Sequence, residues 1–381
     1  MVSADELKYW VGFSRIPGIG RIRFSQLKNY FGNIQDAWNA SETRLRQAGL
    51  ASRSIESLVL LRHKLSLDDE IEKLQRHKVK ALVCEDDAYP LRLKEIYDYP
   101  LVLYVKGKLP PQDTAYLAVV GTRRSTIYGR QVAEEITADL AQNNIVIVSG
   151  LARGIDTVAH RTALDNGGET IAVFGCGLDI IYPAENAKLA QAIMENGALV
   201  SEYPLGTRPR AENFPLRNRI MSGLSLGVLV VEARERSGAL ITAFQALSQN
   251  REVFAIPGSI LAPTSKGTNN LIQQGAKLVS NCDDILEELN LSIVAPQQLE
   301  IKEFSPQNET EAIVIKQLTA EPIHIDEICR LSGLPIAEVS STLAILELEG
   351  IARHIGNMNY VLTHKSRVNY AKEKANNKVK N

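Results

Sequence analysis

The sequence predicts an α/β protein whose centre is an extended Rossmann-like, doubly wound and mostly parallel sheet. From about residue 79 to 290, short β-branched and aliphatic runs alternate with amphipathic helical stretches, and glycines follow the ends of several runs. The core of a run such as 145–148 is wholly apolar, as in strands buried on both faces. The pattern changes on either side, which predicts a helical domain before the sheet and a winged-helix domain after it.

The elements of the sheet segment follow from these runs in order. The expected strands are 101–106, 116–120, 145–149, 170–174, 198–201, 227–231 and 252–256. The expected helices are 130–142, 156–166, 184–196, 239–248 and 269–274. Residues 79–290 are therefore expected to form one Rossmann-like domain.

Residues 1–78 are expected to form a helical domain that contains a helix-hairpin-helix-like turn. Their apolar residues recur at helical spacing, and the segment carries 13 basic and 9 acidic side chains. The run Ile16-Pro17-Gly18-Ile19-Gly20 fits a tight turn between two helices. Turn amides in a helix-hairpin-helix can meet a nucleic-acid phosphate, while an ordinary helix–helix turn is an equally good explanation of five residues.

The C-terminal part is expected to contain a linker at 291–308, a winged-helix domain at 309–364 and a basic tail at 365–381. Helices at 311–318, 325–331 and 336–348 precede a hairpin of 351–354 and 360–362, which is the winged-helix order. The expected recognition helix 336–348 holds Glu338 and Glu347 but no lysine or arginine. Docking of a protein is therefore at least as plausible there as contact with DNA.

Composition narrows the class of protein. The chain has 381 residues, 45% of them hydrophobic, and a net charge of −1, which excludes wholesale disorder. Four widely separated cysteines form no CxxC pair, so a reducing compartment is expected. The first residues lack the features of a secretory signal, and no apolar run reaches the roughly 18 residues of a membrane span. These features predict a soluble, cytoplasmic protein without a membrane partner.

Glycines and cations gather where the strands are expected to end. The expected strands are followed by 121–125, 149–156, 175–179 and 232–238, and ligands bind at this edge of a doubly wound sheet. Glycines allow close backbone approach, and Arg123 and Arg153 could add charge-assisted bonds to the same anion. Each loop alone is an ordinary strand-to-helix turn, but four together predict a ligand that bears phosphate.

The segment 206–219 carries four arginines and one aromatic residue, Phe214. Its prolines are expected to hold much of it extended, with Arg217 and Arg219 leading into a helix that starts near Ile220. Arginines can neutralise a nucleic-acid backbone while Phe214 stacks on a base, as in single-strand binding. The alternative is a solvated loop with Phe214 tucked into the core.

Catalysis and cofactors have little support in the sequence. The dinucleotide fingerprint fails at Ile180, and no P-loop, HExxH or GxSxG motif occurs, so no cofactor, metal site or catalytic residue is predicted. Asp156 and His160 could form a carboxylate-supported base on one helix face, although such a pair more often packs a helix. Glu232 at a strand end is the other acid or base candidate, with a structural hydrogen bond as the alternative.

These residues together resemble the DNA-processing protein A family (DprA, also called Smf). The resemblance is carried by 119–123, 149–156 with Ala159-His160, 177–179 with Tyr182-Pro183, Ser201-Glu202, Phe214-Pro215 with 217–220, Ser237-Gly238 with Thr242, Pro257-Gly258 and 266–269. The flanking regions also look like domains of longer family members, which implies that residues 1–78 form a sterile-alpha-motif-like domain and that the winged helix is the family's C-terminal domain.

The resemblance implies a homodimeric protein, not an enzyme, that binds and protects single-stranded DNA and helps load the RecA recombinase in natural transformation. Carried over residue by residue, the DNA-binding positions are Gly121, Thr122, Arg123, Gly150, Arg153, Gly154, Phe214, Arg217, Asn218 and Arg219. Supporting positions in the pocket are Asp156, His160, Glu232, Ser237 and Gly238. Leu216 departs from the family, because relatives often have a basic residue there. The alternative is a nucleotide-binding phosphoribohydrolase, whose PGGxGTxxE signature has no good counterpart here.

Overall fold

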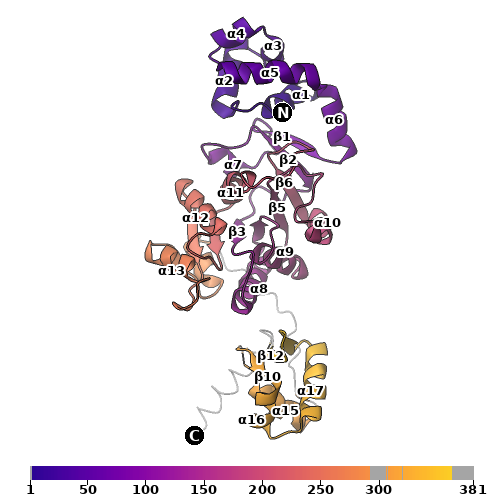
Figure 1. The fold of residues 1–381 in the computed structure, drawn as a ribbon, viewed down its shortest axis with the longest axis vertical. Helices are drawn as coiled ribbons and strands as arrows, with labels where there is room; N and C mark the ends of the chain where they lie inside the picture. The colour runs from indigo at the N-terminus through magenta and orange to yellow at the C-terminus, as the bar shows by residue number, and fades with distance from the viewer. Residues whose placement is uncertain (1, 292–305, 307, 320, 363–381) are drawn as a thin grey trace. The chain divides into compact units, whose positions relative to one another are not determined.

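The computed structural model describes residues 2–291, 306, 308–319 and 321–362. The chain divides into two compact units, 1–294 and 295–381. The expected linker at 291–308 and the basic tail at 365–381 lie largely or wholly outside the described residues. Figure 1 shows the elements of each unit.

The first unit begins with six helices, which confirms the expected helical region. They are α1 (Ala4–Ser14), α2 (Arg21–Phe31), α3 (Ile34–Asn39), α4 (Glu42–Gln47), α5 (Ser52–Lys64) and α6 (Leu67–Arg76). Side chains of Ser3, Asn33, Ser41 and Ser66 accept hydrogen bonds from backbone N–H groups of the first turns, and so fix four of these starts. The turn between α1 and α2 contains Gly18 at a φ of 83°.

A nine-stranded sheet forms the centre of the first unit. Its strands are β1 (Lys80–Val83), β2 (Val102–Gly107), β3 (Tyr116–Val120), β4 (Val146–Ser149), β5 (Thr170–Phe174), β6 (Gly197–Ser201), β7 (Gly227–Val230), β8 (Glu252–Ala255) and β9 (Lys277–Leu278). They lie in the order β1-β2-β6-β5-β4-β3-β7-β8-β9. Pairing is parallel from β6 across to β9, while β1 and β2 add antiparallel strands at one edge. This confirms the doubly wound, mostly parallel sheet.

Helices connect the strands and cover the sheet. They are α7 (Leu91–Glu95), α8 (Ile127–Gln142), α9 (Ile155–Asp165), α10 (Ala187–Glu195) with a preceding 3-10 turn (Ala184–Asn186), α11 (Asn213–Leu224), α12 (Gly238–Ser248), α13 (Lys266–Gln273) and α14 (Asp283–Glu288). One expectation was wrong. The helix expected to start near Ile220 starts at Asn213, because Pro215 falls in the first turn, where a proline is tolerated. Arg217 and Arg219 are therefore helical rather than part of an extended loop.

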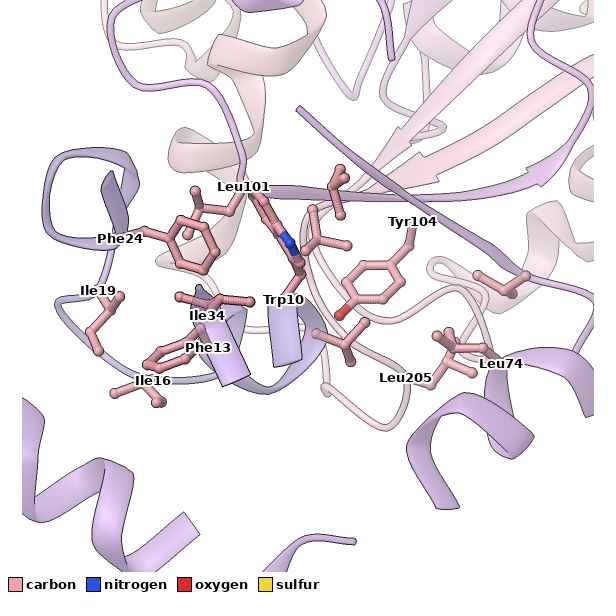
Figure 2. Close-up of a cluster of buried hydrophobic side chains, with 14 of the residues drawn as sticks. Trp10, Phe13, Ile16, Ile19, Phe24, Ile34, Leu74, Leu101, Tyr104 and Leu205 are labelled. Atoms are coloured by element: carbon pink, nitrogen blue, oxygen red, sulfur yellow. The ribbon is translucent and has the colours of Figure 1, made fainter. Parts of the chain in front are cut away.

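The N-terminal helices and the edge of the sheet share one hydrophobic core. Trp10 and Phe24 from α1 and α2 belong to the same buried cluster as Leu101 and Tyr104 beside and on β2 (Figure 2). The rings of Trp10 and Phe24 lie 4.2 Å apart between centroids, and Trp10 is almost fully buried. Burial of rings of this size dominates the stability of such a core. The helices are consequently held against β1 and β2 rather than tethered by chain alone.

The second unit is a small winged helix, as expected. It contains α15 (Glu309–Gln317), β10 (Ile323–His324), α16 (Ile325–Ser332), α17 (Ile336–Leu348), β11 (Ala352–His354) and β12 (Asn359–Leu362). The three strands form their own sheet in the order β10-β12-β11, and a separate cluster that includes Val314, Ile328 and Leu343 fills the core. The short strand β10 was not expected from the sequence.

No single helix in the described ranges is long and apolar enough to cross a membrane. By length and composition alone, one bent helix pair passes the same test, namely α16 and α17 with 114° between them.

Candidate nucleic-acid interface

The predicted loops meet at the carboxyl edge of the sheet, where the strand order reverses between β3 and β7. Backbone hydrogen bonds join the loops to one another. Thr122 N donates to Glu232 O at 2.8 Å, and Ile155 N donates to Thr122 O at 3.3 Å. The loops after β3, β4 and β7 therefore form one connected surface rather than three independent turns.

Two glycines of this surface are required by the space around them. Gly154 has a φ of 77°, and a Cβ there would overlap the carbonyl oxygen of Thr122. A Cβ on Gly150 would overlap the guanidinium of Arg217. Both glycines let protein segments pack closely together, whereas the sequence predicted that they allow close approach of a ligand.

Three side chains form what we call the rim: Arg123, Tyr182 and Phe214. The guanidinium carbon of Arg123 lies 5.6 Å from the Phe214 ring centroid, and the Tyr182 and Phe214 rings lie 5.6 Å apart at 33°. Arg123 is exposed, Tyr182 is 46% exposed and Phe214 is half-buried. Within the described ranges no carboxylate lies within ion-pair distance of Arg123, although its charge acts on the more distant Asp156 and lowers the pKa of that carboxyl. The rim therefore combines an exposed cation with accessible aromatic faces, the two features that bind nucleic acid strands.

Tyr182 was not predicted as a site residue. Its loop follows β5, while Phe214 lies in the first turn of α11, and the two are 32 positions apart in the chain. The available signal was an aromatic residue directly before Pro183. Asn213 Nδ2 donates to Gly175 O at 2.9 Å and so fixes the start of α11 above the end of β5. This bond brings Phe214 to the loop that carries Tyr182.

Beneath the rim lie three buried polar residues, which we call the floor: Asp156, His160 and Arg217. Arg217 is only 4% exposed, and its Nη1 donates to Val173 O. Burial lowers the pKa of Arg217 to about 10, while the charge of Asp156 opposes that shift. Asp156 accepts hydrogen bonds from Gly150 N at 3.1 Å and Ala152 N at 3.3 Å, and burial raises the pKa of its carboxyl.

His160 is fully buried and does not pair with Asp156. The Thr170 hydroxyl donates to Ile147 O at 2.7 Å, so it accepts from His160 Nδ1, also at 2.7 Å. Burial lowers the pKa of His160 to about 3, and the positive charge of Arg217 adds to the shift. A neutral imidazole held in this way packs α9 against β5, and its Nε2 has no hydrogen-bond partner.

Of the predicted supporting residues, Glu232 and Gly238 connect separate segments, and Ser237 caps the start of a helix. The Glu232 carboxylate is buried and accepts from Thr126 N at 2.9 Å and Thr126 Oγ1 at 2.7 Å, at the start of α8. Ser237 Oγ accepts from Ala239 N at the start of α12. Gly238 O accepts from Asn218 Nδ2 at 3.3 Å, which ties α11 to α12.

The other predicted arginines are already paired with carboxylates. Arg153 is exposed and donates to both oxygens of Glu185, at 2.8 and 2.7 Å. Arg219 is mostly buried and pairs with Glu202 and with Asp98, the latter at 3.1 Å. Leu216, which departs from the family pattern, is 54% exposed on α11. Among the predicted arginines, Arg123 thus has the charge most available to a ligand.

The site offers no arrangement for a metal ion. Within the described ranges, no group of three or more His, Cys, Asp or Glu side chains lies close enough to hold one. The carboxylates at this edge, Asp156, Glu232 and Glu185, accept hydrogen bonds from the protein itself, and the exposed Arg123 guanidinium is a donor suited to an anion.

Comparison with known proteins agrees with this geometry. A sequence model of DNA recombination-mediator protein A matches residues 80–290, and a model of the DprA winged helix domain matches residues 303–357. Protein Smf of Escherichia coli is 42% identical over 312 residues, which cover 80% of this chain and 83% of the relative. The DNA processing protein DprA of Streptococcus pneumoniae is 46% identical, covering 60% of this chain and 81% of that protein.

Two solved structures share the fold. DprA from Streptococcus pneumoniae superposes with a TM-score of 0.64 at 38% identity, over 74% of this chain and 97% of the other. DNA processing protein A from Helicobacter pylori, whose structure concerns its single-stranded DNA binding mode, has a TM-score of 0.51 at 34% identity, over 56% of this chain and 96% of the other. Because the matches span both the sheet that carries the rim and the winged helix, the chain belongs to the DNA recombination-mediator protein A family, known as DprA or Smf.

Proposed function

We propose that this protein binds single-stranded DNA at the rim and presents it for recombination. The observation that carries the proposal is the exposed Arg123 guanidinium above the Phe214 ring, with Tyr182 beside it and no carboxylate partner for Arg123 among the described residues. Of the relatives, the Helicobacter pylori protein is described as binding single-stranded DNA, which supports the same ligand here.

Each part of the site has a separate task in this proposal. Arg123 neutralises a backbone phosphate, and the Gly121-Thr122 loop allows the strand to approach the backbone closely. Phe214 and Tyr182 stack on bases, a contact that tolerates any sequence. The floor residues and the remaining predicted positions hold the loops and α11 in place. Binding of this kind breaks no covalent bond, so the proposal includes no catalytic residue.

The proposal extends to partners. A recombination mediator must hand its strand to a recombinase, so we infer that RecA is a partner and that a homodimer presents the DNA. Recombination takes place in the cytoplasm, and the proposal places the protein there. The family description and the resemblance of the motifs support these steps.

The test is a fluorescence-anisotropy titration with labelled single-stranded and duplex oligonucleotides of one sequence, at two salt concentrations. We expect Arg123→Ala to weaken single-strand binding about tenfold, because one charge-assisted phosphate contact is lost. The slope of log affinity against log salt should fall in magnitude by about 0.7.

Arg124→Ala is the matched control, since Arg124 is an exposed neighbour with the same charge that lies outside the rim. Its effect should stay within about twofold. Equal effects of the two substitutions would remove Arg123 from the phosphate site. Displacement of the oligonucleotide by a nucleoside monophosphate would instead favour small-nucleotide chemistry.

A further inference from the structure

A cavity in the first unit lies away from the rim, between α2 and the start of β2. It has a volume of about 430 Å³, which is enough for a group the size of a nucleotide. Trp10, Phe24 and Leu101 close its inner side but are almost fully buried, because they belong to the shared core in Figure 2. Arg21, Lys28 and Tyr99 supply polar groups to the same cavity.

Of its two cations, one is neutralised and the other is not. Lys28 Nζ contacts both carboxylate oxygens of Glu85, at 2.7 and 2.6 Å. The Arg21 guanidinium carbon lies 5.4 Å from the Tyr97 ring centroid and 5.1 Å from that of Tyr99. Within the described ranges Arg21 has no carboxylate partner, and its buried Nε has no hydrogen-bond acceptor. Arg21 is thus a cation held in place by aromatic rings, with hydrogen-bonding capacity still unused.

The position of this cavity connects it to the rim. Asp98, which lies between the two tyrosines in the chain, forms the 3.1 Å ion pair with Arg219 of α11. Phe214 stands in the first turn of the same helix, five residues before Arg219, a rise of about 7.5 Å. The loop that holds Arg21 is therefore anchored directly to the helix that carries the rim.

We propose that the α2 site, which consists of Arg21 and Tyr99 in this cavity with the adjoining Tyr97, takes a second segment of the single strand bound at the rim. The guanidinium of Arg21 binds a phosphate through charge-assisted hydrogen bonds, and a base stacks on the exposed ring of Tyr97. A nucleotide of a strand supplies both the phosphate and the base. Tyr97 is 72% exposed and offers this stacking face.

This inference rests on the proposed binding of single-stranded DNA, and the experiment separates the two. Labelled oligonucleotides of about 6 and about 30 nucleotides are titrated into the full chain, because the shorter one suffices for one site and the longer one can reach both. Arg21→Ala should weaken binding of the longer strand about tenfold and leave that of the shorter within about twofold. Tyr97→Ala should have the same length dependence with a smaller loss.

Arg23→Ala is the matched control. Arg23 lies two residues further along α2 and is exposed, and its guanidinium donates to Gly18 O. Both variants are first compared with the unmodified chain in thermal unfolding. The inference would be overturned if Arg21→Ala and Arg23→Ala weakened binding equally, or if Arg21→Ala weakened binding of both lengths equally. A loss of affinity confined to duplex DNA would also overturn it, as would displacement of the longer strand from this cavity by a free nucleoside monophosphate. Failure of the proposed function has another signature, in which Arg123→Ala leaves the affinity for both lengths unchanged.

Discussion

The rim and the floor differ in chemistry although they lie in the same site. The rim residues Arg123, Tyr182 and Phe214 are accessible, and their charge and ring faces are available to a ligand. The floor residues Asp156, His160 and Arg217 are buried and directed at backbone groups of the protein. The sequence motifs contain both accessible rim residues and buried floor residues, and the motifs alone do not show which residue belongs to which group. The difference teaches that a motif residue at a binding edge either contacts the ligand or holds the contacting residues in position.

A charged group in the floor would be costly without compensation, and the structure provides that compensation locally. The Asp156 carboxylate receives two backbone N–H groups, and the Arg217 guanidinium donates to a strand carbonyl. These bonds join β4, β5, α9 and α11 below the rim. Substitutions in the floor should therefore reduce stability first and DNA binding second, while substitutions in the rim should do the reverse.

The largest effect that this comparison predicts is at Gly154. Gly154→Ala should destabilise the protein by about 3 kcal/mol, because it adds a Cβ at positive φ and overlaps the Thr122 carbonyl. Gly238→Ala is the matched control, since a Cβ there meets nothing within 4 Å. Chemical denaturation measures both. If Gly154→Ala kept full stability but lost DNA binding, Gly154 would belong with the rim.

The second prediction concerns pH and His160. Its pKa in the folded protein is about 3, below the ordinary value of 6.5, so the unfolded chain binds more protons between these values. Stability should therefore fall as the pH drops, by about 2.5 kcal/mol between pH 7.5 and 4.5 from this group alone. The raised pKa of Asp156 has the opposite sign, because burial makes the folded protein bind this proton at a higher pH than the unfolded chain does.

The contribution of His160 is isolated by comparison with His160→Asn, whose amide can still donate to Thr170. Denaturant unfolding at several pH values should give a shallower pH dependence for the variant than for the unmodified protein. Parallel curves would mean that His160 has the same pKa in the folded and the unfolded chain, and that the floor is more hydrated than its burial indicates.

The sequence predicted most of the sheet because its signals are local. The strands Tyr116–Val120 and Thr170–Phe174 are almost wholly apolar runs, and the structure has them at the expected bounds. The short edge strands β1 and β9 were missed because few residues carry each pattern. The start of α11 was missed because Pro215 was interpreted as a residue of an extended segment, whereas the first turn of a helix accepts proline.

The partition between rim and floor could not be predicted, because it depends on contacts between distant segments. Arg217 and Arg123 are both arginines in glycine-rich or proline-rich loops of the sequence. Arg217 is part of the core because it donates a hydrogen bond to the carbonyl of Val173, which lies 44 positions away in the chain. The carboxylates of Glu202 and Asp98 likewise occupy Arg219, and neither lies next to it in the sequence.

The third prediction sharpens the definition of the rim. Tyr182→Ala should weaken binding of single-stranded DNA about tenfold, because loss of one stacking platform costs about 1–3 kcal/mol. Tyr182→Phe keeps the ring and should bind within about twofold of the unmodified protein. Anisotropy titrations measure both, and thermal unfolding should show little change for either, because Tyr182 is half-exposed. Equal losses in the two variants would assign the effect to the hydroxyl instead of the ring.

The smallest effect should come from Arg153, a predicted DNA contact that is held by Glu185 through two hydrogen bonds. Arg153→Ala should change DNA affinity by only about twofold, since an exposed paired cation contributes little. Glu185→Gln removes the competing charge and should strengthen binding about twofold to threefold at low salt, with the gain disappearing as salt rises. A large loss for Arg153→Ala would mean that DNA displaces Glu185. Arg153 would then be a fourth rim residue whose charge becomes available only when the strand is bound.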